Sequence, residues 1–446
     1  MRVCGKALPP RAALLLTFDF TSLVLVMPLL LTASSLTGLA PKPLATFLPS
    51  LVGLMVVGLT CQAVFYYNEL YNLQVVRHPG AVLVRVLRAF ALLSSLLAIS
   101  CLALPMVVPV LSHILLFAST LALLTVFTRV GALPRKRERV LMLGTGEEAA
   151  ELQETILACS EWNMEVTQIL HPAQLNVEWP DGDEAPASFD RIIVSDMRAQ
   201  PSPALEHLLH WKMQGLQIED AQGFYERATG RVRVDHLTPE QFVFSYNFNN
   251  GAGKRRWMRG FDLLAASALL VLTSPAILIV ALFSWCQRDG PIIFKQERIG
   301  LNGKPFLIYK FRTMRVVEAN RSARWAADEE HRITPQGAFL RKYRLDELLQ
   351  LFNIVKGDMS LVGPRPEQPQ FCRMLAERIP FYEQRHTVLP GLTGWAQVRY
   401  HYGSSIEESK RKLEFDLFYV KHLSLWLDCA ILIETVKVVL VGRGAR

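Results

Sequence analysis

Four long apolar runs in the first third of the chain set the strongest limit on its fold. A transmembrane helix needs about 20 apolar residues to cross the hydrocarbon core of a bilayer. Three of the runs are close to that length, and the third reaches it if it begins near Val82, with Arg85 and Arg88 at its interfacial end. The pattern predicts an α-helical transmembrane bundle of four helices within residues 1–130. The runs are Ala12–Leu31, Thr46–Phe65, Ala89–Met106 and Val107–Phe127.

Basic residues in the connecting segments predict how this bundle is oriented. Lys and Arg cluster before the first run, in the second connection and after the fourth run, whereas the first connection offers only Lys42. Because basic loops stay in the cytoplasm, we expect both ends of the bundle inside and everything after Arg129 in the cytoplasm. The first run is expected to be an uncleaved anchor, since further spans follow it. For Asp19, within that run, a functional role and a capped helix end both remain open.

Composition agrees with a membrane protein that keeps a large polar part. The 446 residues are 51% hydrophobic and 20% charged, with a net charge of +8 and a mean hydropathy of +0.22. An ordinary soluble enzyme or a disordered chain seldom has this balance. The seven cysteines form no CxxC pair, which predicts reduced thiols and neither disulfides nor a zinc site. The histidines form no ligand cluster, so no transition metal is expected.

A second region has the pattern of an α/β module. Arg139–Ala149 has the pattern of a strand, a G-x-G-x-x-A turn and a helix start, and Glu165–Leu170 and Arg191–Val194 are typical of further strands. This predicts a Rossmann-like α/β module over residues 137–240. A glycine turn at a helix N-terminus can hold a phosphate. Glu147 and Glu148 put negative charge at that place, which favours a structural or regulatory module over nucleotide binding. An Asn- and Gly-rich linker, residues 241–253, follows.

The fifth apolar run, Phe261–Phe283, is predicted to enter the membrane and return. Ser274-Pro275 lies at its centre, and proline removes a backbone donor and kinks a helix. The Ser274 hydroxyl can satisfy a carbonyl that the proline leaves without a donor. Basic clusters flank both ends of the run, and a re-entrant helix keeps both in the cytoplasm. An ordinary kinked span is the alternative. A later apolar stretch, Ser424–Val441, carries three charged residues and predicts an interfacial or core helix.

Residues after this run combine strand patterns with many cations. Pro291–Gly300 and Phe306–Met314 are predicted to be strands. Four apolar residues then recur at helical spacing, which predicts a helix with one buried face. Asp346 and Glu347 are expected off that face, about one turn after Arg341. The apolar residues are Leu345, Leu348, Leu349 and Phe352.

The adjacent carboxylates among arginines are compatible with a metal-assisted phosphoryl site. Carboxylates bind Mg²⁺ together with water and substrate phosphates, and arginines bind phosphate oxygens in pairs. A carboxylate can also act as a nucleophile. An Asp-Glu pair on a helix is more often a solvated face, so the pair alone does not establish a site. Its combination with the surrounding arginines favours one.

At these residues the chain resembles the bacterial sugar transferase family, the monotopic polyprenyl-phosphate sugar-1-phosphate transferases. The resemblance covers residues 254–446, as a mostly α catalytic domain with a re-entrant membrane helix. The four predicted spans and the α/β module resemble the family's long form. The matching motifs are Arg259–Asp262, Ser274-Pro275, Tyr309–Met314, Leu345–Leu351, Lys356–Ser360, Val362–Pro366 and Gly394–Val398.

The resemblance implies a mechanism. Asp346 would attack the β-phosphate of a UDP-sugar, UMP would leave, and undecaprenyl phosphate would then take the sugar phosphate from the aspartate. Mg²⁺ would bind at Asp346 with Glu347 in support. The implied phosphate-binding residues are Arg341, Arg365 and Arg259, and the implied substrate-binding residues are Lys310, Arg312 and Gln397. Met258 stands before Arg259 where the family often has Lys, so nearby basic residues would have to supply that charge.

The same resemblance implies partners and a place in the cell. The partners are a UDP-sugar, undecaprenyl phosphate and the lipid bilayer, with no nucleic acid, and a homodimer is left open. We expect a multi-pass protein of the bacterial inner membrane that begins exopolysaccharide, capsule or O-antigen synthesis. A nucleotide-sugar dehydratase would need a Tyr-x-x-x-Lys pair, which the chain lacks. A non-catalytic scaffold would be expected to have lost Asp346 or Glu347. The motifs do not name the sugar.

Overall fold

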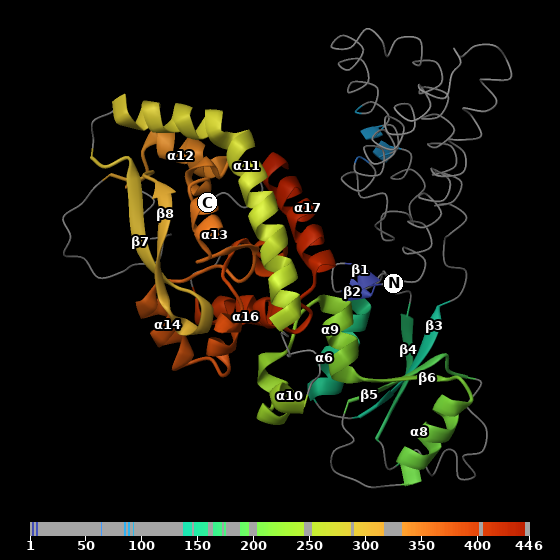
Figure 1. Cartoon of the computed structure of the whole chain (residues 1–446). Coiled ribbons are helices and arrows are strands. Elements are labelled where there is room, and N and C mark those ends of the chain that lie inside the picture. Colours follow the sequence, from blue (N-terminus) through green and yellow to red (C-terminus); the bar gives the residue numbers. More distant parts are fainter. Residues whose placement is uncertain are drawn as a thin grey trace, which may run out of the picture. The chain divides into compact units, whose positions relative to one another are not determined.

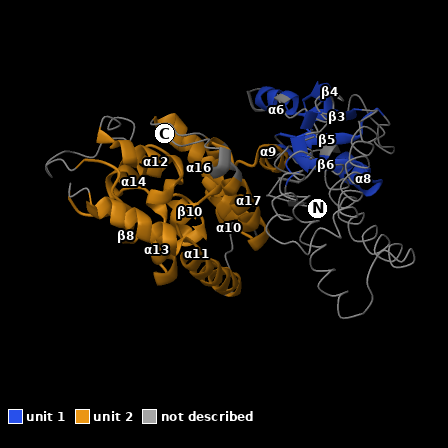
Figure 2. Cartoon of the chain, turned by 90° about the horizontal axis from the view of Figure 1, so that it is seen from above, with its two compact units in different colours: residues 1, 7–221 blue, residues 2–6, 222–446 orange. Residues whose placement is uncertain are grey.

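The computed structural model describes residues 2–3, 6–7, 64, 84–85, 88–89, 92, 137–144, 147–158, 164–171, 174, 188–195, 203–244, 252–286, 290–315, 332–400 and 405–441. The predicted transmembrane bundle, Asp19 and most of the predicted linker lie outside these residues, apart from a few isolated positions. The chain forms two compact units, one of residues 7–221 and one of residues 222–446 with residues 2–6 (Figure 2). Two short strands, β1 (Arg2–Val3) and β2 (Lys6–Ala7), pair with each other.

The first unit contains a four-stranded parallel sheet in the order β4-β3-β5-β6. Its strands are β3 (Glu138–Leu143), β4 (Met164–Leu170), β5 (Arg191–Val194) and β6 (Gln217–Asp220). The strands predicted from the apolar patterns in this region are therefore confirmed. Central strands β3 and β5 have no exposed residue, and Val140–Leu143 and Ile192-Ile193 are buried, as expected of a parallel sheet covered on both faces.

Two helices connect neighbouring strands of this sheet. Helix α6 (Glu147–Ala158) joins β3 to β4, and α8 (Pro203–Met213) joins β5 to β6. The chain moves in opposite directions along the sheet in these two crossovers, so right-handed connections place the helices on opposite faces (Figure 1). Gly144 ends β3 with a φ of 140°, a conformation that favours glycine. Trp211 of α8 is fully buried in the core under the sheet.

The second unit is mainly helical, with two two-stranded sheets. After α9 (Ala221–Thr229) its elements are η4 (Val234–His236), α10 (Pro239–Phe244), α11 (Ala252–Cys286), β7 (Ile293–Ile299), η6 (Leu301–Gly303), β8 (Pro305–Phe311), α12 (Pro335–Lys342), η8 (Leu345–Glu347), α13 (Gln350–Lys356), β9 (Ser360–Val362), α14 (Pro369–Ala376), η9 (Tyr382–Thr387), β10 (Gly391–Thr393), α15 (Trp395–Arg399), α16 (Ile406–Lys421) and α17 (Leu425–Val441), where η marks a 3₁₀ helix. Strands β7 and β8 pair antiparallel, and β9 and β10 pair parallel.

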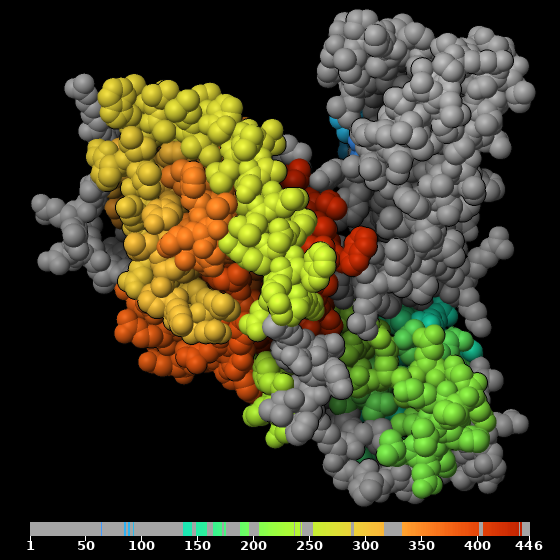
Figure 3. Space-filling model, in the orientation of Figure 1, coloured from blue at the N-terminus to red at the C-terminus, as the bar shows by residue number. Residues whose placement is uncertain are grey.

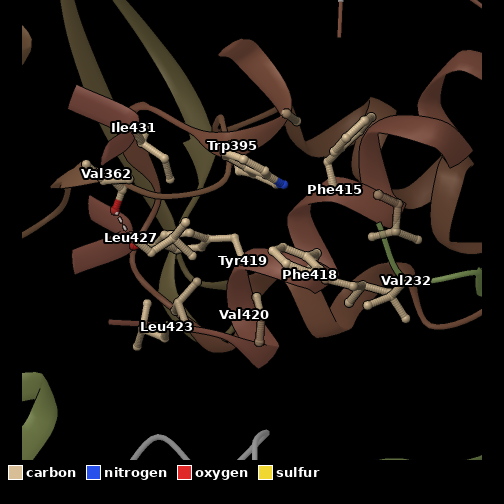
Figure 4. Close-up of a cluster of buried hydrophobic side chains, with 14 of the residues drawn as sticks. Val232, Val362, Trp395, Phe415, Phe418, Tyr419, Val420, Leu423, Leu427 and Ile431 are labelled. Atoms are coloured by element: carbon tan, nitrogen blue, oxygen red, sulfur yellow. Dashed lines mark hydrogen bonds between the residues drawn. The ribbon is translucent and has the colours of Figure 1, made fainter. Parts of the chain in front are cut away.

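Helix α16 forms the centre of this unit's core. Its N-terminus has a capping box, in which the Ser405 hydroxyl and the Glu408 carboxylate each accept a hydrogen bond from the other residue's amide. Its last two turns are buried on all sides. Figure 4 shows Phe418 beside Trp395, with Val232 from the segment after α9 in the same cluster. Because Val232, Val234 and Leu237 all join this core, residues before the predicted boundary at 254 contribute to its packing.

Helix α11 is long enough to cross a membrane and is poorly covered by protein. Its 35 residues correspond to about 52 Å of helix. In the described part of the chain, residues 253–286 form one helix whose length and apolar character would suffice to cross a membrane. Large apolar side chains on it are mostly exposed, including Val271 at 77% and Leu272 at 76%. Figure 3 shows α11 at the surface of the second unit along its length.

Pro275 lies inside α11, and Figure 1 shows the helix running in two directions on either side of a bend. Proline cannot donate to the carbonyl four residues earlier, which belongs to Val271. The Ser274 hydroxyl donates to that same oxygen at 2.8 Å. This contact is the one expected of Ser274 beside the proline, and the bend has an identifiable cause.

Both halves of α11 pack against the second unit. Before the bend, Ala266 is fully buried in the core that contains α16. After the bend, Val280 is buried in a second cluster with Phe311 of β8, Leu340 of α12 and Leu349. Positions on both sides of the bend are thus attached to the same unit.

Candidate active site

Asp346 and Glu347 lie in the 3₁₀ helix η8, between α12 and α13. Both residues are buried, with 7% and 6% of their surface exposed. The prediction that they lie off the buried face is therefore wrong. Carboxylates are rarely buried without charge partners, because transfer out of water is costly for an ionised group. Their burial indicates a built site, and the solvated face that an Asp-Glu pair usually forms is excluded here.

The backbone around η8 explains why helical spacing misled the sequence prediction. Arg344 adopts a left-handed conformation with a φ of 52°, which ends α12 and starts a new turn. A 3₁₀ turn advances about 120° per residue, so side chains in η8 fall on faces different from those of a continuous α-helix. Phe352, predicted to be buried, is accordingly 51% exposed.

Three cations converge on the Glu347 carboxylate. Lys310 Nζ lies 2.9 Å and Arg365 Nη2 2.8 Å from its Oε1, and Arg344 Nη1 lies 3.4 Å from its Oε2. Burial alone would raise the pKa of Glu347. The charges of Arg365, Lys310 and Arg344 nevertheless hold this pKa well below its usual range. Glu347 is therefore ionised at neutral pH and fixes the three cations in place.

Asp346 has a different electrostatic environment. Burial, together with the adjacent Glu347 charge, raises the pKa of Asp346 to about 6 against the opposing effects of Lys310, Arg341 and Arg365. Within the described residues, its carboxylate makes no hydrogen bond or ion pair. At neutral pH it is thus mainly ionised, surrounded by cations and not engaged with any of them. That combination is typical of a group that reacts with or binds an incoming phosphate.

These carboxylates differ in their fitness to bind a divalent cation. No group of three or more His, Cys, Asp or Glu residues suited to a metal is found in the described part of the chain. Mg²⁺ usually needs only one or two protein carboxylates, and substrate phosphates and water supply the rest. Asp346 fits that requirement, whereas both oxygens of Glu347 already bind basic side chains.

Lys310 and Arg341 are fixed by hydrogen bonds to neighbouring elements. The Asn353 amide, fully buried in α13, donates to the Leu307 carbonyl at 2.7 Å and accepts from the Tyr309 amide at 3.2 Å. These bonds attach β8, and with it Lys310, to α13. Arg341 Nε donates to the Thr313 hydroxyl at 3.1 Å. Because the Thr313 carbonyl is too close to Gly337 for a Cβ, glycine is needed there.

Carbonyl contacts hold the loop that carries Arg365. The fully buried Arg385 donates to the Arg365 carbonyl at 2.9 Å and to Asp416 at 2.8 and 3.1 Å. Arg298 donates to the Pro366 carbonyl at 3.1 Å. Because Arg385 of η9 and Arg298 of β7 both hold the backbone of this loop, the Arg365 guanidinium is directed at Glu347. The predicted rigid loop is consistent with these contacts.

Gln397 and Arg312 lie on other elements of the same unit. Gln397 belongs to α15, and both polar atoms of its side-chain amide are buried without a hydrogen-bond partner among the described residues. A buried amide without partners is unusual and is suited to a ligand. A Cβ on Gly394 would lie 2.2 Å from the Gly363 carbonyl, so glycine lets this turn pack against the Arg365 loop. Arg312 directly follows β8, and its amide donates to the Ile292 carbonyl at 3.1 Å.

Arg259 lies at the C-terminus of α13. Its guanidinium donates to the carbonyls of Ile354 at 2.6 Å and Val355 at 2.9 Å, in the last turn of that helix. The Ile354 carbonyl also accepts from the Gly357 amide at 3.1 Å. A cation there also interacts favourably with the helix dipole. Arg259 thus joins α11 to α13, and its role at a lipid phosphate stays a prediction.

Sequence reasoning missed several residues that hold the site together. Arg344 lay next to the predicted pair but was not included among the site residues, and no short motif marks Asn353 or Arg385. All three act through contacts between segments far apart in the chain or through an unusual backbone angle. A buried polar residue within an apolar stretch is the one signal that could have drawn attention to Asn353.

The geometry defines a site for anionic groups beside an apolar helix, and the comparisons with known proteins agree. Residues 253–442 match the family described as Bacterial sugar transferase. A sugar transferase of Bacillus subtilis, EpsL, is 43% identical over 192 residues, which cover 42% of this chain and 89% of that protein. The chain therefore belongs to the bacterial sugar transferase family.

Two longer relatives carry more specific names. The UDP-N-acetylgalactosamine-undecaprenyl-phosphate N-acetylgalactosaminephosphotransferase of Aeromonas hydrophila is 41% identical over 228 residues, covering 50% of this chain and 52% of that protein. The UDP-glucose:undecaprenyl-phosphate glucose-1-phosphate transferase of Escherichia coli K12 is 39% identical over 215 residues, covering 48% and 46%. The chain thus matches about half the length of these two relatives, over its own C-terminal half.

Proposed function

We propose that this protein transfers a sugar-1-phosphate from a UDP-sugar to undecaprenyl phosphate and releases UMP. Relatives whose names state this reaction with glucose and N-acetylgalactosamine support the substrate classes. The observation that carries the proposal is the Asp346 carboxylate, which is buried near cations but makes no hydrogen bond or ion pair within the described residues. Such a product would begin the assembly of a polysaccharide on its lipid carrier.

In the first step an Asp346 oxygen attacks the β-phosphorus of the UDP-sugar. An acyl-phosphate bond forms, the bond from that phosphorus to the bridging oxygen breaks, and the electron pair leaves with UMP. Lys310, Arg341 and Arg365 are the side chains whose charges favour ionised Asp346, and they would also stabilise the charge on the phosphate oxygens. Glu347 would hold Lys310 and Arg365 in position for that task.

In the second step an oxygen of undecaprenyl phosphate attacks the same phosphorus. The bond to Asp346 breaks, the carboxylate is regenerated, and the sugar is left joined to the lipid through a diphosphate. Water is not consumed in either step. Mg²⁺, when bound, would supply positive charge to the phosphates, and Asp346 is the carboxylate free to hold it. The Gln397 amide, and Arg312 beside β8, are proposed to bind the substrate.

The path of α11 supports a re-entrant helix. Val280 after the bend and Ala266 before it both pack into the catalytic unit, although the helix is long enough to span a bilayer. A helix that returns to the cytoplasmic side would bring the site to the depth of a lipid phosphate. We further propose an inner-membrane protein with four N-terminal spans, a cytoplasmic catalytic domain and a Rossmann-like module in the first unit.

UMP release tests the reaction. The purified full chain in nanodiscs, given undecaprenyl phosphate, Mg²⁺ and a panel of UDP-glucose, UDP-galactose and UDP-N-acetylgalactosamine, should release UMP with at least one sugar. Asp346→Asn should abolish that release, whereas Asp235→Asn, the same change at an exposed residue paired with Lys410, should retain it. Release of UDP, or no release with any sugar, would exclude the proposed reaction and favour another transferase class or a scaffold.

Cys286 at the end of α11 allows a test of the re-entrant path. This thiol is free and exposed. In a variant that keeps only this cysteine, a membrane-impermeant maleimide should label it in inside-out vesicles and not in intact spheroplasts. Labelling from the periplasmic side would show that α11 crosses the membrane and would overturn the re-entrant assignment.

A further inference from the structure

Asp428 of α17 is a buried acid that the proposed reaction does not use. It is 3% exposed, and its Oδ1 lies 2.9 Å from the Tyr419 hydroxyl of α16. The same hydroxyl lies 3.0 Å from the Val362 carbonyl at the end of β9 (Figure 4). Arg365 follows Val362 by three residues. A continuous chain of contacts therefore connects Asp428 to the loop that carries a cation of the site.

Counting protons shows what this arrangement requires. A phenol has one proton to donate, and a backbone carbonyl has none. If Tyr419 donates to Val362, then Asp428 must donate to Tyr419 and must itself carry a proton. If Asp428 is ionised, Tyr419 instead donates to it, and the Val362 carbonyl faces a lone pair at 3.0 Å. Both short contacts are satisfied together only when Asp428 is neutral.

We propose that Asp428 is protonated in the folded enzyme and acts through Tyr419 as a positioning residue for the Val362–Arg365 loop. The inference rests on the proposed function for its kinetic consequences, but not for the hydrogen-bond arrangement itself. The proposal gives α17 a role in supporting the Val362–Arg365 loop, and this role is separate from any contact with the membrane surface. Thr435, two turns further along α17, shares a 2.7 Å hydrogen bond with Thr393 of β10, the strand that pairs with β9.

Charged groups around Asp428 agree with a neutral acid. Burial raises the pKa of Asp428 to about 8, the Tyr419 hydrogen bond opposes that rise, the Asp262 charge adds to it, and Lys254 opposes it. Asp262 and Lys254 both face it from α11, and Cys429 is its neighbour on α17. Asp262 itself accepts from the Leu361 amide at 3.0 Å, which places a second acid against the same strand.

Three variants of the full chain in nanodiscs test the proposal. Asp428→Asn keeps a donor for Tyr419 at every pH, Asp428→Leu removes it at similar size, and Tyr419→Phe removes the link. With the best UDP-sugar of the panel, Asp428→Asn should retain near wild-type kcat/KM at neutral pH. The other two should lose about fivefold or more, the effect of one hydrogen bond. The alkaline decline of kcat/KM, expected near pH 8 in the wild type, should be absent in Asp428→Asn.

Hydrogen exchange of the Leu361–Arg365 amides gives a readout that needs no substrate. After correction for the intrinsic rate, exchange in the wild type should rise about fivefold between about pH 6.5 and about pH 9.5, and Asp428→Asn should show no rise. An unchanged alkaline limb in Asp428→Asn, or wild-type exchange and kinetics in Asp428→Leu, would overturn the proposal. Failure of UMP release in every protein, with the predicted exchange pattern intact, would instead reject the proposed function alone.

Discussion

The buried ion pair between Arg385 and Asp416 provides a demanding test of how the site is held. Arg385 is 5% exposed and Asp416 2%, and the guanidinium makes two hydrogen bonds to one carboxylate oxygen. It also donates to the Tyr382 hydroxyl at 2.8 Å and to the Arg365 carbonyl. Replacing Arg385 with Met keeps much of the volume but leaves Asp416 as an uncompensated buried charge.

The expected size of the effect follows from this burial. Removing one partner of a buried ion pair costs about 3–5 kcal/mol. An exposed pair contributes only about 0–1 kcal/mol. Lys356 provides the matched control, because its side chain is 62% exposed and pairs with Asp358 at 2.9 Å. Arg385→Met should therefore destabilise the second unit strongly, and Lys356→Met should have almost no effect.

Hydrogen exchange of the α16 amides, measured on the full chain in nanodiscs, reports the second unit without the first. Protection in Arg385→Met should fall by about two to four orders of magnitude, at about 1.4 kcal/mol for each factor of ten. Adding Asp416→Leu should restore much of the protection, since apolar residues often replace a buried ion pair at little cost. Activity should stay low in the double variant, because the Arg365 carbonyl still lacks its donor.

Two results would refute this reasoning. Protection in Arg385→Met equal to that in Lys356→Met would mean that the pair is not buried as described. Full recovery of UMP release in the double variant would mean that the hydrogen bond to the Arg365 carbonyl does not position the loop.

Three further predictions concern the carboxylates and their surroundings. Because Asp346 must be ionised to attack and its pKa is raised to about 6, kcat/KM should fall as the pH drops through about 6. Arg341→Met removes a cation that lowers this pKa, so in a pH–rate profile it should move the acidic fall of kcat/KM to higher pH. Lys342→Met should leave the position of that fall unchanged. Asn353→Leu should destabilise the contact between β8 and α13 by about 1–3 kcal/mol for each group left unpaired. The expected results are faster hydrogen exchange in β8 and a higher KM for the UDP-sugar. Chelation with EDTA should abolish UMP release, and Mg²⁺ should restore it; release unaffected by EDTA would contradict the assignment of Mg²⁺ as cofactor.

Local patterns in the sequence predicted the secondary structure well where the pattern was strong. Alternating and continuous apolar runs indicated β3, β4, β5, β7 and β8. The apolar run around Ser274-Pro275 indicated a long helix with a break, and in the structure the Ser274 hydroxyl donates, as expected, to the carbonyl that Pro275 leaves without a donor. These features depend on neighbours within about one helical turn, so the sequence contains the information directly.

Features that depend on distant contacts or unusual dihedral angles could not be predicted in the same way. The left-handed Arg344 converts an apparent α-helix into a 3₁₀ turn and buries both carboxylates. The motifs pointed to Lys310 and Arg365, but not to their shared contact with Glu347 across 37 and 18 residues. The supporting residues Asn353, Arg385 and Asp428 are recognisable only once the segments they join are side by side.

The central claim is that Asp346 forms a covalent bond to the sugar phosphate, and mass spectrometry tests it most directly. The full chain is incubated with a UDP-sugar and Mg²⁺ without undecaprenyl phosphate, quenched in acid and digested. The account predicts one equivalent of UMP and a peptide containing Asp346 that is heavier by one sugar phosphate, which disappears when undecaprenyl phosphate is added. UMP release that requires the lipid phosphate, with no modified peptide, would contradict the account and indicate direct transfer between the two substrates.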